Sequence, residues 1–171
     1  MTPYTFELFG TDHIFSILSI IIFYIIFLKY NEKIGIQNKN KLFLIVLAFI
    51  IISLDLSEDI VRLITGYYSI KKDLPLQLCS IGIYVAAYAL LTMRQTAFEL
   101  IFYWGLVGAS QAILTPDGDL FEIKIFFFYS QAYHAALIFS VFWLMVKYDM
   151  RMHINAIPKM VIITNIVVIF I

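Results

Sequence analysis

Charged residues are scarce in this sequence, and no polar stretch is longer than a loop. Only 14% of the residues are charged and 62% are hydrophobic. A soluble domain is typically about 25% charged and about 45–50% apolar. The shortage of charge excludes a separate soluble domain and predicts an integral membrane protein. The 12 basic and 12 acidic residues cancel. Because nucleic-acid-binding proteins carry a basic surface, we expect no nucleic acid partner.

Cysteine is nearly absent, and the N-terminal residues lack the signals of a cleaved leader. A single cysteine excludes an internal disulfide. Residues 1–10 have neither the basic region nor the small-residue cleavage site of a signal peptide. We therefore expect the first apolar run to be retained as a membrane helix.

Long apolar runs dominate what remains. A membrane-spanning helix needs about 20 mostly apolar residues, and six stretches reach or approach that length. They lie at about 12–30, 42–64, 76–93, 97–115, 124–147 and 158–171. We predict an all-α fold, a polytopic bundle of six transmembrane helices forming one transmembrane domain over residues 1–171.

The basic residues indicate an orientation, because lysine and arginine favour the cytoplasmic side. The loops after the first, third and fifth predicted helices carry eight of the 12 basic residues, and the other side carries four. This bias predicts a multi-pass protein of the cell membrane with its N-terminus outside.

Polar residues inside the apolar runs are candidates for function, because they cost free energy at membrane depth. The second run contains Asp55, Glu58, Asp59 and Arg62, whose spacing puts them on one helical face. These acids must pair with Arg62 or stay protonated. They form either a solvated stripe at the helix end or the wall of a buried polar cavity; the depth of Asp55 favours the cavity.

The only cysteine, Cys79, opens the third helix beside Gln77 and Ser80. A buried cysteine is often a small hydrophobic residue, but the flanking polar groups favour a functional thiol. In the fifth helix, His134 is either a satisfied core histidine or a base, since neutral imidazole is the cheaper form inside a membrane.

Two further polar residues complete the candidate set. Gln111, in the fourth helix, needs a hydrogen-bond partner and can donate to a carbonyl oxygen or an oxyanion. His13 opens the first helix, where the interface tolerates histidine. Counting helical rise from the N-terminal side puts all these residues in one half of the membrane and predicts a single polar cavity. The count places Cys79 shallower than His134 by roughly 10 Å, a gap that helix tilt or a break after Pro75 must close.

Three segments resemble a known family. They are LPLQLCS at 74–80, FYWGLVGASQAILTPD at 102–117 and YSQAYH at 129–134. With His13 near the start of the first helix, they resemble the YwaF-like bacterial integral membrane proteins. That family is similar to the eukaryotic transmembrane protein 164 group, lysophospholipid acyltransferases that use a cysteine and a histidine. The resemblance implies these two roles for Cys79 and His134.

The resemblance also marks two departures. Many relatives have histidine where this chain has Gln77, and the family usually has a seventh helix, which we expect to be missing here.

Residues and resemblance together predict a cysteine- and histidine-dependent phospholipid acyltransferase whose partners are membrane lipids and which needs no cofactor. Gln77 or Gln111 would donate to the oxyanion, an acid of the second helix would orient His134, and an apolar cavity would hold the acyl chain. The alternative is a small-molecule binding or transport component, of the vitamin-uptake type, whose acidic stripe binds a cationic ligand or relays protons. A metal site is the least favoured, because no typical ligand spacing is present.

Overall fold

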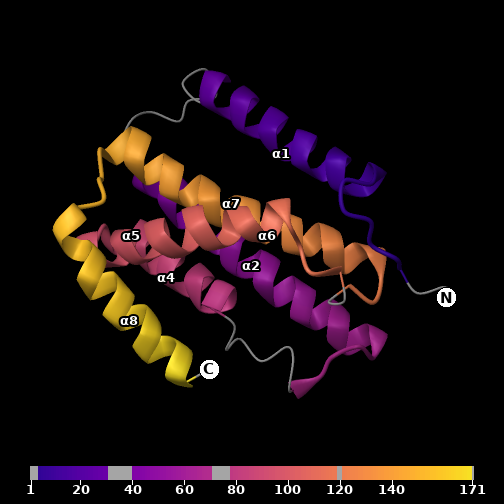
Figure 1. Ribbon diagram of the computed structural model, residues 1–171. Helices are drawn as coiled ribbons and strands as arrows, with labels where there is room; N and C mark the ends of the chain where they lie inside the picture. Colours follow the sequence, from indigo (N-terminus) through magenta and orange to yellow (C-terminus); the bar gives the residue numbers. More distant parts are fainter. Residues whose placement is uncertain (1–3, 31–39, 71–77, 119–120, 171) are drawn as a thin grey trace.

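The computed structural model describes residues 4–30, 40–70, 78–118 and 121–170. Within these ranges the chain is helical, with no strand, so the predicted helix bundle is confirmed (Figure 1). The elements are α1 (Thr11–Tyr30), α2 (Lys41–Thr65), α4 (Leu78–Thr92), α5 (Gln95–Ile101), the π-helix η1 (Phe102–Ala109), α6 (Ser110–Leu114), α7 (Lys124–Tyr148), the 3-10 turn η3 (Ile154–Ala156) and α8 (Ile157–Phe170). The fourth predicted helix is the continuous series α5, η1 and α6.

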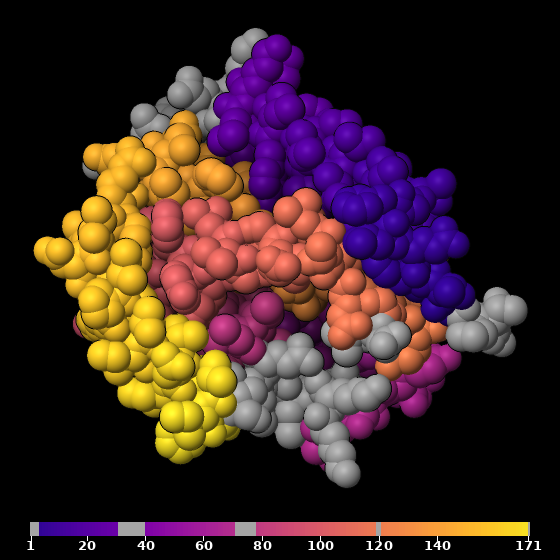
Figure 2. All heavy atoms as spheres, viewed as in Figure 1, coloured from indigo at the N-terminus to yellow at the C-terminus, as the bar shows by residue number. Residues whose placement is uncertain are grey.

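Three helical stretches of the described chain are long and apolar enough to cross a membrane: Thr11–Tyr30, Gln95–Leu114 and Lys124–Tyr148. Two shorter apolar helical stretches accompany them, Leu78–Thr92 and Ile154–Phe170. Figure 2 shows α1 and α8 at opposite edges of one face, with the α5–α6 series between them. Large apolar side chains are exposed along both outer helices, a surface that suits lipid rather than water.

Local signals set the ends of α2. Asn40 precedes the helix, and its side chain accepts a hydrogen bond from the Phe43 amide at 3.2 Å, which satisfies one of the free N–H groups of the first turn. Gly66 ends the helix with φ of 77°, a left-handed conformation that glycine adopts without steric cost.

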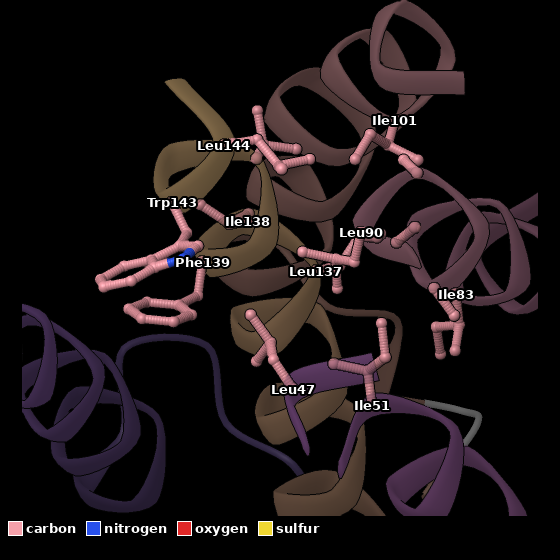
Figure 3. Close-up of a cluster of buried hydrophobic side chains, with 14 of the residues drawn as sticks. Leu47, Ile51, Ile83, Leu90, Ile101, Leu137, Ile138, Phe139, Trp143 and Leu144 are labelled. Carbon is pink, nitrogen blue, oxygen red and sulfur yellow. The ribbon is translucent and has the colours of Figure 1, made fainter. Parts of the chain in front are cut away.

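Helix α7 is the centre of the bundle. It packs against α1, α2, α4, α5, η1 and α6. Its side chains Leu137 and Leu144 are almost fully buried among apolar residues of α2, α4 and α5 (Figure 3). Because α7 touches nearly every other element, its polar residues are the ones that can meet partners from several helices.

A π-helix replaces the α-helix in the middle of the fourth span. π-helical turns are rare and are often found at functional sites. Here η1 comes close to α7 at Gly105, where an added Cβ would lie 3.3 Å from Val141 Cγ2. An added Cβ at Gly108, one turn further on, would have no atom within 4 Å. The close approach of the two helices therefore depends on Gly105.

Helix α8 is joined to the fourth span by side chains. The Trp104 indole donates to Thr164 Oγ1 at 3.0 Å, and Lys159 donates to Thr96 Oγ1 at 3.2 Å. Met160 is fully buried at this contact. The last helix is thus packed on α5 and η1, away from α1.

The two glycines provide a matched test of this packing. Gly105→Leu inserts a side chain against Val141 and is expected to destabilise the fold by about 1–3 kcal/mol, the usual cost of overpacking. Gly108→Leu adds the same side chain where there is room and is expected to leave stability unchanged or higher. Thermal unfolding in detergent measures both; equal effects of the two changes would contradict the close packing.

Candidate functional site

Polar side chains from α2, α4 and α7 meet between these three helices, in a region partly open to the surface, where Tyr84 is 40% exposed. The Asp55 carboxylate faces the hydroxyls of Ser80 and Tyr84 on α4. The Tyr133 hydroxyl of α7 lies near the carboxylates of Asp55 and Glu58 and near the Cys79 thiol. We call these residues the polar cluster: Asp55, Glu58, Cys79, Ser80, Tyr84 and Tyr133.

Arg62 neutralises part of the acidic stripe. Its guanidinium lies 3.1 Å from Glu58 and 3.0 Å from Glu122, and it stacks over the Phe126 ring at 4.0 Å. Asp55 and Arg62 are only 8% and 7% exposed, so these two residues face the protein interior rather than solvent. Asp55 Oδ2 is buried without a hydrogen-bond partner. The buried-cavity interpretation of the stripe therefore fits these two residues better than the solvated one.

Cys79 lies at the start of α4 as a half-buried free thiol. One turn further along, an added Cβ on Gly82 would lie 3.6 Å from Leu137 Cδ2 of α7. Cys79 and His134 are each three residues before this contact, and Figure 1 shows α4 and α7 running the same way. Both residues are therefore at about the same depth, and the separation expected from counting helical rise was too large.

His134 is 3% exposed and has a defined tautomer. Its Nδ1 lies 2.7 Å from the Ser130 carbonyl oxygen, which can only accept, so Nδ1 carries the proton. Nε2 keeps its lone pair and is buried without a hydrogen-bond partner. The structure therefore does not join His134 to Cys79 by a hydrogen bond, and neither Asp55 nor Asp59 orients the imidazole.

Tyr133 lies between the two predicted catalytic residues. Its ring packs on the His134 ring with centroids 4.2 Å apart, and its hydroxyl contacts Ser130. Ser130 Oγ is 3.4 Å from His134 Nδ1. The polar cluster and His134 are thus neighbours through Tyr133 and Ser130.

His13 is also buried, but both of its nitrogens are used. The Phe9 amide donates to Nδ1 at 3.0 Å, so Nε2 carries the proton and donates to the Ile113 carbonyl at 2.8 Å. His13 therefore joins the start of α1 to the end of α6 and has no free lone pair. This arrangement supports a structural role rather than a catalytic one.

The structure does not bring the predicted oxyanion donor Gln111 to the polar cluster. Gln111 is exposed on α6, and its amide donates to Thr115 Oγ1 at 3.1 Å. Gln77 lies outside the described residues. Of the two predicted oxyanion donors, the one that the structure describes is therefore on the surface.

Glu99 and Gln131 are buried polar residues that the predicted site does not include. Glu99 is 4% exposed and accepts from Gln95 and His153, each at 2.9 Å; its position near the start of a helix resembles an ordinary solvated end. Gln131 is 2% exposed, and neither its amide nitrogen nor its oxygen has a partner. Its place three residues before His134 was the only signal that could have found it.

The rim of the bundle carries another ion pair. Lys124, the first residue of α7, lies 2.7 Å from Asp12, which also accepts a hydrogen bond from the Tyr4 hydroxyl at 3.1 Å. Burial and this hydrogen bond raise the pKa of Tyr4 to about 12. Among the described residues, no three His, Cys, Asp or Glu side chains are grouped so that they could hold a metal ion.

The Arg62 pairs are testable through stability. Arg62→Met leaves Glu58 and Glu122 without their cation, and breaking a buried pair from one side costs about 3–5 kcal/mol. The double variant Arg62→Met with Glu58→Gln removes the more buried of the two uncompensated charges and leaves Glu122, whose side chain is more exposed, so we expect it to recover much of the loss. Denaturation of the detergent-solubilised protein measures both; equal instability of the single and double variants would contradict this pairing.

One comparison with known proteins identifies the family of this chain. No curated protein and no solved structure matches the sequence. The sequence does match a protein family, described as the TMEM164 family, over residues 8–171. Because this match covers nearly the whole chain, including α4 with Cys79 and α7 with His134, this membrane protein belongs to the TMEM164 family.

Proposed function

We propose that this protein transfers acyl groups between phospholipids through a thioester on Cys79. The observation that carries the proposal is the position of this thiol. It is the only cysteine of the chain, it is half-buried in a polar cluster among membrane helices, and it is level with a histidine whose Nε2 has no partner. Membership of the TMEM164 family supports the same chemistry through the resemblance described above.

In the first step, the Cys79 thiol is deprotonated, because the thiolate is the nucleophile. His134 Nε2 is the only ring nitrogen of that residue with a free lone pair, so it is the atom that accepts the proton. The sulfur attacks the ester carbonyl of a phospholipid, the carbon–oxygen ester bond breaks, and the proton passes to the leaving alkoxide. The products are an acyl-enzyme and a lysophospholipid.

In the second step, the hydroxyl of another lysophospholipid attacks the thioester. His134 takes the hydroxyl proton and returns it to the sulfur as the carbon–sulfur bond breaks. The balance requires no cofactor and no redox partner. Catalytic hydrogen bonds are often long in unliganded structures and tighten with substrate. The proposal therefore includes a side-chain rotation of His134 that brings Nε2 past Tyr133 to the Cys79 thiol.

The remaining polar residues have supporting roles in this scheme. Arg62 holds Glu58 through its ion pair, which limits the negative charge facing the thiolate. The Tyr133 hydroxyl lies near the Cys79 thiol and would donate a hydrogen bond there. Gln77, two residues before Cys79, remains the predicted oxyanion donor.

Mass spectrometry of the purified protein tests the covalent intermediate. Incubation with phosphatidylcholine is expected to add one acyl mass to the peptide that contains Cys79, and hydroxylamine is expected to remove it. Cys79→Ala should abolish both adduct and transfer. Full transfer activity in Cys79→Ala would end the proposal.

His134 and His13 form a matched pair for the proton step. His134→Gln is expected to slow transfer by about 100-fold or more, since a general base typically contributes a factor of 10²–10⁴. His13→Gln, which alters a structural histidine, is expected to reduce stability but to leave the pH dependence of transfer unchanged in the folded fraction. The role of His134 as base is wrong if both variants keep the wild-type pH profile.

One observation favours the second candidate, a binding or transport component for a small cationic molecule. Asp55 Oδ2 is buried without a partner and could accept a hydrogen bond from a charged amine. Glu58 already forms an ion pair with Arg62, so fewer carboxylates of the acidic stripe remain to bind a cationic ligand. A tightly bound metabolite that dissociates from Asp55→Asn, in protein with no acylated Cys79, would favour this candidate.

A further inference from the structure

An apolar cavity of about 380 Å³ lies between α1, α2 and α7, beside the polar cluster. Ligand pockets in proteins typically measure roughly 300–1,000 Å³. The α2 residues that line the cavity are Phe43, Leu47, Ile50 and Leu54, one stripe of the helix. At a rise of about 1.5 Å per residue this stripe is about 16 Å long, so the cavity is elongated along the helices.

The polar groups in the wall are already satisfied. The Ser19 hydroxyl donates to the Phe15 carbonyl at 2.7 Å, and the Tyr24 hydroxyl donates to the Ala135 carbonyl. The other lining residues have apolar side chains. An occupant therefore finds no free hydrogen-bonding side chain, which disfavours a polar ligand and favours a hydrocarbon.

The two ends of the cavity differ. At one end Phe27, Phe43 and Phe139 close it, with ring centroids 5.7 Å and 4.9 Å from the Phe27 ring. At the other end the lining residues Leu54 and Ala132 immediately precede Asp55 and Tyr133 of the polar cluster. The cavity thus has an aromatic floor at one end, and its other end is next in sequence to residues of the polar cluster, none of which lines it.

We propose that this cavity between α1, α2 and α7 binds one acyl chain of a membrane phospholipid, with the ester end of the lipid at the polar cluster. Two of the three surrounding helices, α1 and α7, are long and apolar enough to span the membrane, so phospholipid is the hydrocarbon source at this depth. The assignment of the bound chain as the one transferred by Cys79 rests on the proposed function; the binding itself does not.

Photolabelling tests the occupant. The full-length protein in phosphatidylcholine nanodiscs receives a phosphatidylcholine with a diazirine in one acyl chain, and adducts are mapped by mass spectrometry. We expect adducts on the cavity stretches of α2 and α7, such as Leu47 and Phe139, both in the unaltered protein and in Cys79→Ala. Adducts spread evenly over lipid-facing residues, such as Ile162 and Ile166 of α8, would overturn the proposal.

Filling the cavity provides the variant test. Ala136→Phe places a ring in the cavity and is expected to abolish labelling there, whereas Val146→Phe, on an exposed part of the same helix, should keep it. Ala132→Phe, at an exposed position of the wall, serves if Ala136→Phe fails to fold. Undiminished labelling in a folded cavity-filling variant would overturn the proposal.

Further arms separate the sources and the two proposals. A photoreactive fatty acid and a photoreactive sterol are tested in the same way. If either probe labels the cavity residues and the phosphatidylcholine probe does not, the phospholipid assignment is wrong. Cavity labelling without any thioester on Cys79 would support the binding site and refute acyl transfer. A thioester on Cys79 without cavity labelling would refute the binding site alone.

Discussion

The burial of polar side chains inside a membrane bundle is the constraint on which this structure depends. In hydrocarbon, a charge or hydrogen-bonding group must find a protein partner, because no water is available to replace it. Arg62 meets this demand by bridging Glu58 and Glu122, and so holds α2 to the start of α7. His13 meets it through backbone groups at Phe9 and Ile113, and so holds α1 to α6.

The polar atoms that do not meet this demand are equally informative. Asp55 Oδ2, both amide atoms of Gln131, His134 Nε2, Trp143 Nε1 and the Tyr148 hydroxyl are buried without partners. Unsatisfied buried groups are costly and uncommon in proteins. Four of these five residues belong to α7, and the fifth, Asp55, faces the polar cluster that Tyr133 of α7 completes. In the described part of the chain, the unsatisfied groups are therefore concentrated along the central helix.

Much of the helical framework could be predicted from the sequence, because a long apolar run has few alternatives to a membrane helix. The π-helix could not be predicted, because no characteristic amino-acid composition distinguishes its wider turn from that of an α-helix. Depth also failed. Counting from helix starts assumes that all helices begin in one plane, yet the predicted starts at residues 124 and 76 lie 13 residues before Leu137 but only six before Gly82. This offset of seven residues, roughly 10 Å of helix, accounts for the overestimated separation of Cys79 and His134.

The direction of individual side chains was the second limit. Helical periodicity says which residues share a face, but not which face points inward. Gln111 was therefore assigned to the cavity and lies on the surface, whereas Tyr133, one of several tyrosines in the sequence, lies at the centre of the polar cluster.

Helix α7 also explains how one small bundle can combine two chemistries. Ala132 and Ala136 line the apolar cavity, while Tyr133, between them in sequence, lies beside Cys79 and the acids of α2. Successive residues of a helix point about 100° apart, at about 3.6 residues per turn, so one turn of α7 contributes to both the hydrocarbon wall and the polar wall. A lipid placed across that turn would have its chain among apolar residues and its ester at the thiol. On the two proposals, the position of the reacting carbonyl is set by the fixed geometry of a single helical turn rather than by a mobile loop.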